Sequence, residues 1–160
     1  MLSSFLKKLL FARQFEMADG KIEILGKKQV MVPSDVIYDL QIINPKLTYN
    51  NIKRDIRKDI EDYARKLGSG EEGMLKNIDY LFETFGLGKM QVVTIDNKKK
   101  NCIIRVYNSP FLGSQVLKDN LQITPAVLSG IFSFLLEKDV DAQQTNVSIK
   151  GTNYLEYVIK

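Results

Sequence analysis

Residues 124–136 form a helical segment that is apolar around most of its circumference, and no other feature constrains the fold as strongly. Its apolar positions are Val127, Leu128, Ile131, Phe132, Phe134, Leu135 and Leu136. A helix without a polar face must be covered on several sides, which predicts a layered structure with this helix inside. Thr124 is the expected N-cap, and Pro125 suits the first turn. Gly130 costs about 1 kcal/mol relative to alanine in a helix interior, so a sheet or a flat ligand must approach it closely, with sheet contact favoured.

Two hairpins flank this helix in the sequence. Residues 90–96 and 102–108 alternate as strands do, and a second hairpin turns around residues 150–153. The two glycines of residues 85–89 mark the point where a preceding helix gives way to the first of these strands. The predicted fold class is therefore α+β: an antiparallel sheet of two C-terminal hairpins joined by a buried helix and packed against long helices.

The first half of the chain is predicted to be mainly helical. Residues 47–67 carry apolar side chains at helical spacing, and a second long helix ends near Phe85. Before them we expect a helix over residues 1–15, a hairpin with strands 21–25 and 29–32, and a helix over 35–43. That last helix carries an apolar stripe made of Val36, Leu40 and Ile43. A length of 160 residues favours one domain, 1–160, with residues 1–46 as an N-terminal part and 47–160 as the core.

Several chemistries are excluded by residues that the chain lacks. It has no histidine, so no imidazole base or histidine metal ligand is possible. Its one cysteine, Cys102, rules out an intrachain disulfide and a multi-cysteine zinc site, and fits a reducing, cytoplasmic compartment. Cys102 alternates with apolar residues, which indicates a small core side chain instead of a reactive thiol. We therefore expect no catalytic residue, no bound metal and no cofactor.

The charge balance argues against nucleic-acid binding. The net charge is +4, and the only dense basic cluster is the run from Lys98 to Lys100. This run lies between two expected strands, where a solvated hairpin tip is the favoured interpretation over a phosphate site. No apolar run is long enough to span a membrane.

The expected N-terminal helix has one apolar face with basic residues elsewhere. A basic amphipathic helix over residues 1–15 can lie on a membrane surface, but packing against its own domain or a second copy is favoured. Because closed dimers are the commonest soluble oligomers, we expect a homodimer that uses these residues.

Four short motifs, in this order, resemble the 4-vinyl reductase domain, also described as hydrocarbon-binding. They are residues 81–88, residues 106–111, the glycine-bearing helix and the closing segment 150–159. The resemblance covers residues 69–160 well and the first seventy in outline, and stand-alone archaeal members look much like this chain. It implies a small α+β domain similar in fold to the vesicle-tethering TRAPP subunits.

The family pattern is matched unevenly. Gly86 and Gly88 match its helix-to-strand turn, residues 108–110 its strand-end signature, and Gly151 the glycine of its final hairpin. Tyr157 occupies a position where the family usually has phenylalanine. Family members often carry a glutamate and two cysteines around the final hairpin, where this chain has Gln144, Val147 and Leu155. A thiolate metal site or redox role at that hairpin is therefore not expected.

Three functions remain open at this stage. The favoured one is binding of a small aromatic, lipid-like or tetrapyrrole-like molecule in an apolar pocket, as a sensor or carrier. The residues predicted to line that pocket are Phe85, Tyr107, Phe111, Gly130 and Phe132. Each of these aromatics, taken alone, is more often a core residue. The alternatives are a dimeric interaction scaffold and, least favoured, a reductase with a borrowed cofactor, because no dinucleotide fingerprint or P-loop is present.

Overall fold

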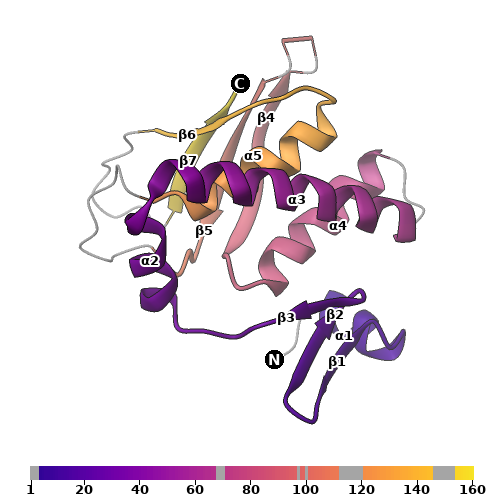
Figure 1. The fold of residues 1–160 in the computed structure, drawn as a ribbon. Coiled ribbons are helices and arrows are strands. Elements are labelled where there is room, and N and C mark those ends of the chain that lie inside the picture. The colour runs from indigo at the N-terminus through magenta and orange to yellow at the C-terminus, as the bar shows by residue number, and fades with distance from the viewer. Residues whose placement is uncertain (1–3, 68–70, 97, 100, 112–120, 146–153) are drawn as a thin grey trace. The chain divides into compact units, whose positions relative to one another are not determined.

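In a computed structural model the chain is organised as two compact units, Met1–Pro33 and Ser34–Lys160 (Figure 1). The structure describes residues 4–67, 71–96, 98–99, 101–111, 121–145 and 154–160. The turn expected at residues 150–153 lies outside this part of the chain. The organisation into one domain divided at residue 46 stays a prediction.

The first unit holds a short helix and a small antiparallel sheet. Helix α1 (Ser4–Phe11) precedes strands β1 (Phe15–Ala18), β2 (Lys21–Ile24) and β3 (Lys27–Gln29), which pair in the order β1-β2-β3. Two-residue turns, Asp19-Gly20 and Leu25-Gly26, join the strands, and all four residues have positive φ. Type I′ hairpin turns require this conformation at both central positions, and their twist matches that of the strands.

Two sequence-based boundaries in this unit are wrong. The helix expected over residues 1–15 ends at Phe11, and Phe15 already belongs to β1. The second strand of the hairpin was expected at residues 29–32, but β3 ends at Gln29 because the turn at Leu25-Gly26 is shorter than the predicted loop. Val30, Met31 and Val32 therefore lie beyond the strand and are exposed.

The described residues of the second unit form four helices. They are α2 (Ser34–Ile43), α3 (Pro45–Leu67), α4 (Glu71–Thr84) and α5 (Ile123–Leu135). Pro45 begins α3, where its fixed φ and missing N–H are tolerated. The stripe predicted on α2 forms, but Val36, Leu40 and Ile43 are 44%, 60% and 77% exposed. This apolar face of α2 is therefore not part of the core.

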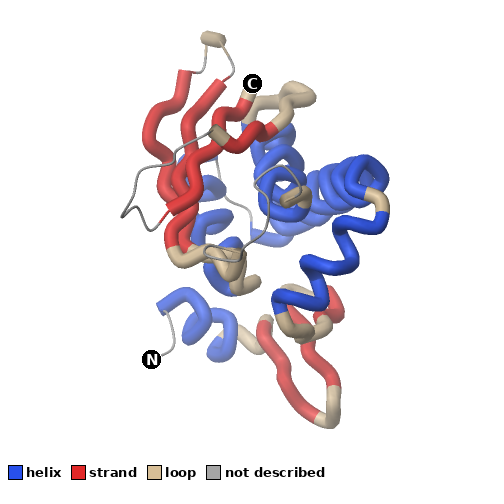
Figure 2. The backbone as a smooth tube through the Cα atoms, turned by 90° about the vertical axis from the view of Figure 1, so that its left-hand side faces the viewer, coloured by secondary structure: helices blue, strands red, loops and turns tan. Residues whose placement is uncertain are grey.

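The sheet of the second unit has four antiparallel strands in the order β4-β5-β7-β6. They are β4 (Lys89–Asp96), β5 (Asn101–Tyr107), β6 (Ala142–Gln144) and β7 (Tyr154–Ile159). Each hairpin therefore places one strand at the centre and one at an edge, and the α+β prediction is confirmed. Figure 2 shows the helices of this unit gathered on one face of the sheet.

Helix α5 is the core of this unit. It contacts β6 and β7 on one side and α3 on another, and every residue from Thr124 to Ser133 is buried. On β5, Cys102, Ile104 and Val106 are buried while the residues between them are half-buried, so alternate side chains face the helices. The burial predicted from the apolar circumference is confirmed. The N-cap prediction is wrong, because the N-cap position is Gln122 and Thr124 lies inside the helix.

The turn from α4 into β4 depends on Gly88. Its φ is +108°, and a Cβ at this position would lie 2.4 Å from the Tyr107 carbonyl oxygen. Only glycine permits this conformation and this approach of the neighbouring strand. The helix-to-strand change expected at residues 85–89 is confirmed.

Candidate functional site

The five residues predicted to line a pocket have different environments. Phe132, on α5, is fully buried, and Phe111, beyond the end of β5, is 9% exposed. Phe85 directly follows α4 and is half-buried. Their ligand-binding roles stay predictions.

Gly130 lies at a close contact between helices. A Cβ built on it would be 2.6 Å from the Lys53 carbonyl oxygen and 3.0 Å from two side-chain atoms of Ile56, both on α3. The close approach expected from the sequence is thus made by a helix, instead of the favoured sheet or a flat ligand. Gly130 is therefore explained by the packing of α5 against α3, and its role as a pocket residue stays a prediction.

Tyr107 lies on the opposite face of the sheet from the helices. It neighbours the inward-facing Val106 on β5, and its hydroxyl donates to Gln91 Oε1 at 3.0 Å. Its ring lies 5.3 Å from that of Tyr154, over which the Arg105 guanidinium is placed at 4.7 Å. Tyr107 therefore belongs to this outer face, whereas Phe132 is buried in the core.

The first turn of α5 is capped by a side chain from α2. Gln41 is 1% exposed, and its Oε1 accepts hydrogen bonds from the backbone N–H groups of Gln122 at 2.7 Å and Ile123 at 3.1 Å. Helix N-termini leave such donors without intrahelical partners, so Gln41 performs the role of an N-cap from a distant part of the sequence. Its own Nε2 is buried and has no hydrogen-bond partner.

Two further buried polar atoms lie beside this turn. The hydroxyls of Thr124 on α5 and Tyr157 on β7 are both in fully buried residues, and neither atom makes a hydrogen bond. Burial raises the pKa of Tyr157, and the neighbouring Thr124 hydroxyl offsets part of this effect. The Thr124 side chain is thus close enough to Tyr157 to influence its pKa, although the two hydroxyls do not form a hydrogen bond. Buried polar groups are usually satisfied, so three unsatisfied ones at one helix turn require an explanation.

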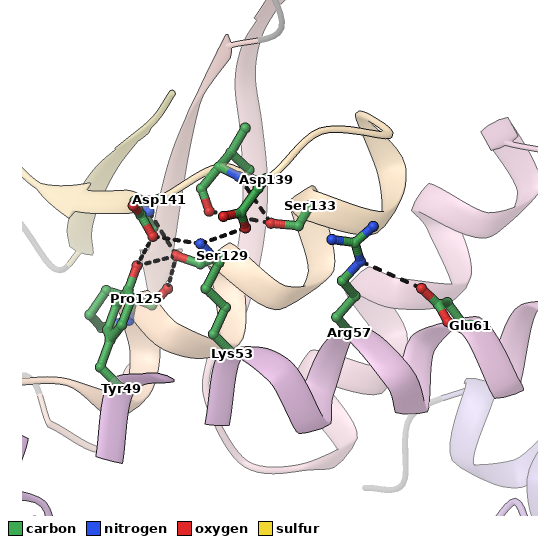
Figure 3. Close-up of polar contacts among 11 residues, drawn as sticks. Tyr49, Lys53, Arg57, Glu61, Pro125, Ser129, Ser133, Asp139 and Asp141 are labelled. Atoms are coloured by element: carbon green, nitrogen blue, oxygen red, sulfur yellow. Dashed lines mark hydrogen bonds and ion pairs between the residues drawn. The ribbon is translucent and has the colours of Figure 1, made fainter. Parts of the chain in front are cut away.

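A second polar cluster joins α3, α5 and the segment leading into β6 (Figure 3). The Tyr49 hydroxyl lies 2.7 Å from Ser129 Oγ and donates to Asp141 Oδ1 at 2.8 Å. Lys53 Nζ lies 2.7 Å from Asp141 Oδ1 and 2.9 Å from Asp139 Oδ1. The cluster fixes the start of β6 against both helices.

The serines of α5 complete this attachment. Ser129 Oγ accepts from the Ala142 N–H at 2.7 Å and donates to the Pro125 carbonyl, and Ser133 Oγ accepts from the Val140 N–H at 3.1 Å. These N–H groups lie on the outer edge of β6, since Asp141 and Thr145 direct theirs toward β7. Backbone donors that a further strand would have paired are thus satisfied by helix side chains.

A tyrosine beside a serine and a lysine has the components of a proton-transfer site, but its electrostatics oppose that use. Mainly through burial, the pKa of Tyr49 is raised to about 12. Burial lowers the pKa of Lys53, but Asp139 and Asp141 outweigh it and the net pKa is raised. A general acid or base works best with a pKa near the operating pH, so this cluster fits a structural role.

Metal binding and thiol chemistry would involve residues outside these two clusters. Within the described ranges, no group of three or more acidic or thiol side chains is placed to bind a metal ion. Val147 and Gly151 lie outside those ranges. Cys102 is 2% exposed, and burial raises the pKa of its thiol to about 12, which fits the predicted core role. No helix within the described residues is a candidate for spanning a membrane.

Sequence reasoning missed the residues that organise both clusters. These residues act through partners distant in the chain: Gln41, Tyr49, Ser129 and Tyr157. Tyr157 had a signal in the sequence, as a departure from the family's usual phenylalanine. The two serines also offered a weak signal, since polar residues four apart interrupt an otherwise apolar helix.

No family model and no curated protein matches the sequence. Among solved structures, the chain is similar to the phenol-responsive sensory domain of the transcription activator PoxR, with phenol. The TM-score is 0.70 at 15% identity, over 99% of this chain and 91% of that one. A trafficking protein particle complex subunit 3 from Naegleria fowleri, covalently bound to palmitic acid, matches with a TM-score of 0.49 at 11% identity, over 80% and 89%. A vinyl-4-reductase family protein from Methanocaldococcus jannaschii matches with a TM-score of 0.48 at 12% identity, over 100% and 96%.

These similarities define the chain at the level of fold. It shares its α+β fold with the PoxR domain, at a TM-score of 0.70. Identities of 11–15% carry no information about activity.

Proposed function

We propose that this chain binds a small, mostly apolar molecule in its second unit, between α5 and the four-stranded sheet. One observation carries the proposal: the Thr124 and Tyr157 hydroxyls are buried between these elements without hydrogen-bond partners. A core that served packing alone would favour apolar side chains there, because an unsatisfied buried hydroxyl is costly. A bound molecule would satisfy both groups.

The fold supports this proposal. The sensory domain of PoxR is described as phenol-responsive and shares its fold with almost the whole of this chain. Buried aromatic residues such as Phe132 and Phe111 would supply apolar contacts around the ligand. The cluster around Tyr49 and Lys53 lacks the pKa values of an acid–base catalyst, so we place the function in sensing or carrying.

Native mass spectrometry of the purified full chain tests this function. We expect a bound small molecule under gentle conditions, absent under denaturing ones, or a rise in melting temperature with at least one member of a panel of uncharged aromatic and alicyclic compounds. Ligand at a hundred times its Kd stabilises by about 2.7 kcal/mol, which such an assay detects. A protein that carries nothing and responds to no member of the panel would rule the function out.

A second proposal concerns self-association. We infer that the chain forms a homodimer, now on the basis of the exposed stripe Val36, Leu40 and Ile43 on α2. Contiguous exposed apolar residues on a helix are unfavourable in water and usually mark an interface. In α1, Leu9 is 2% exposed, whereas Leu10 and Phe11 are 42% and 91% exposed, so this helix stays a second candidate for the interface.

Leu40→Lys and Ile43→Lys test the dimer. Each places a charge in the stripe, and we expect sedimentation to show a monomer where the wild type is a dimer. Lys28→Glu, at an exposed position of β3, is the control and should leave the dimer intact. A wild-type monomer at every concentration would refute the proposal.

A further inference from the structure

Three uncharged polar groups lie around the first turn of α5. Gln41 accepts from the N–H groups of Gln122 and Ile123, Thr124 is the next residue, and Tyr157 lies on β7, which packs against α5. All three side chains are at least 99% buried, and each has one polar atom without a partner.

Each unsatisfied atom has a local cause. Oε1 of Gln41 is held by two backbone donors, which leaves its NH₂ group directed elsewhere. Thr124 is the second residue of α5, so no preceding helical turn offers its hydroxyl the carbonyl that Ser129 finds at Pro125. Tyr157 is fully buried on β7 between two other strands. None of the three can turn to water.

We propose that Gln41, Thr124 and Tyr157 form the polar end of the ligand site and select an uncharged ligand that carries a hydroxyl group. This inference rests on the proposed function. The Gln41 NH₂ group only donates, whereas the two hydroxyls both donate and accept. A ligand hydroxyl accepts from one of these groups and donates to another; a carbonyl oxygen accepts only, and a hydrocarbon does neither.

The site disfavours a charged ligand. None of the three groups carries a charge, and burial of a carboxylate or ammonium without a paired charge is strongly unfavourable. Because burial raises the pKa of Tyr157, its phenol stays protonated through neutral pH. Selection should therefore be independent of pH around neutrality.

Calorimetric titration of the full chain with toluene, 4-methylphenol and 4-methylbenzoate tests the inference. We expect 4-methylphenol to bind about tenfold or more tightly than toluene, the ratio that roughly one net hydrogen bond produces. At pH 7, 4-methylbenzoate should not bind measurably. Methylcyclohexane and 4-methylcyclohexanol give the same comparison for ligands without a ring π-system.

Isosteric variants test which side chains cause the preference for a hydroxyl-bearing ligand. Tyr157→Phe and Thr124→Val each remove one hydroxyl while keeping the shape, and each should reduce the preference for 4-methylphenol several-fold while the affinity for toluene is retained. Tyr63→Phe is the control: Tyr63 is 2% exposed on α3, and its substitution should leave the preference unchanged.

The outcomes distinguish failure of this inference from failure of the proposed ligand-binding function. Equal affinities for toluene and 4-methylphenol would mean that a buried water satisfies the three groups, and would overturn the inference while ligand binding stands. Tight binding of 4-methylbenzoate, or an unchanged preference in both Tyr157→Phe and Thr124→Val, would also overturn it. If no compound of either series binds, the proposed function itself fails.

Discussion

Gly130→Leu should prevent the second unit from folding. Even a Cβ at this position would lie 2.6 Å from the Lys53 carbonyl oxygen, which is backbone and cannot rotate away. A leucine adds three more carbons at the same point and would force α3 and α5 apart. We expect the free energy of unfolding to fall by more than about 3 kcal/mol, above the usual range for overpacking. The protein should then be insoluble, or show no cooperative unfolding transition.

Two further substitutions make this prediction specific: Gly130→Ala, and the same change at an exposed helical glycine. Alanine adds the Cβ alone, so the protein should fold, with a free energy of unfolding lower by about 1–3 kcal/mol. Gly73 lies in α4 and is exposed, so Gly73→Ala should be neutral or stabilising by up to about 1 kcal/mol. A soluble Gly130→Leu protein with wild-type stability in chemical denaturation would contradict the contact between α3 and α5.

This contact illustrates what the sequence predicts and what it omits. An interior glycine in an apolar helix indicates that something comes close, but the approaching group is 74–77 positions away in the sequence, at Lys53 and Ile56. The same limit applies to the α2 stripe: its apolar face was predicted correctly, and only the tertiary structure shows that Leu40 is exposed while its neighbour Gln41 is buried.

Local signals were more reliable. The hairpins of the larger sheet, the helix-to-strand turn at Gly88 and the burial of α5 follow from alternation, glycine placement and apolar circumference, all of which act over a few residues. The first strand, β1, was missed although Asp19-Gly20 is a strong hairpin signal. Of the predicted pocket residues, Tyr107 belongs to the outer face of the sheet because the strand alternates, and Gly130 contacts a helix.

Gln41→Leu should destabilise the second unit by about 2–3 kcal/mol, because the backbone donors of Gln122 and Ile123 would be buried without an acceptor. Leucine has a similar volume and removes the amide, so the loss reports on hydrogen bonding more than on a cavity. The free energy of unfolding from urea denaturation measures it. Amide exchange at Gln122 and Ile123 should accelerate at the same time.

The control for this prediction is Gln143→Leu. Gln143 is exposed on β6, where the same substitution should change stability by less than about 0.5 kcal/mol. Equal effects at both positions would show that α5 does not depend on Gln41 for its N-terminal cap.

The attachment of β6 to Ser129 and Ser133 makes the two borders of the sheet unequal. On the β6 border the outward N–H groups of Val140 and Ala142 are already bonded to a helix, so no foreign strand can pair with them there. β4 forms the other border; the backbone of Met90 near its start is hydrogen-bonded to Asp79, and its pairing with β5 shifts register between Val92 and Thr94. We therefore expect strand addition, whether in a complex or in aggregation, at β4 beyond Met90, where charges or a proline would oppose it.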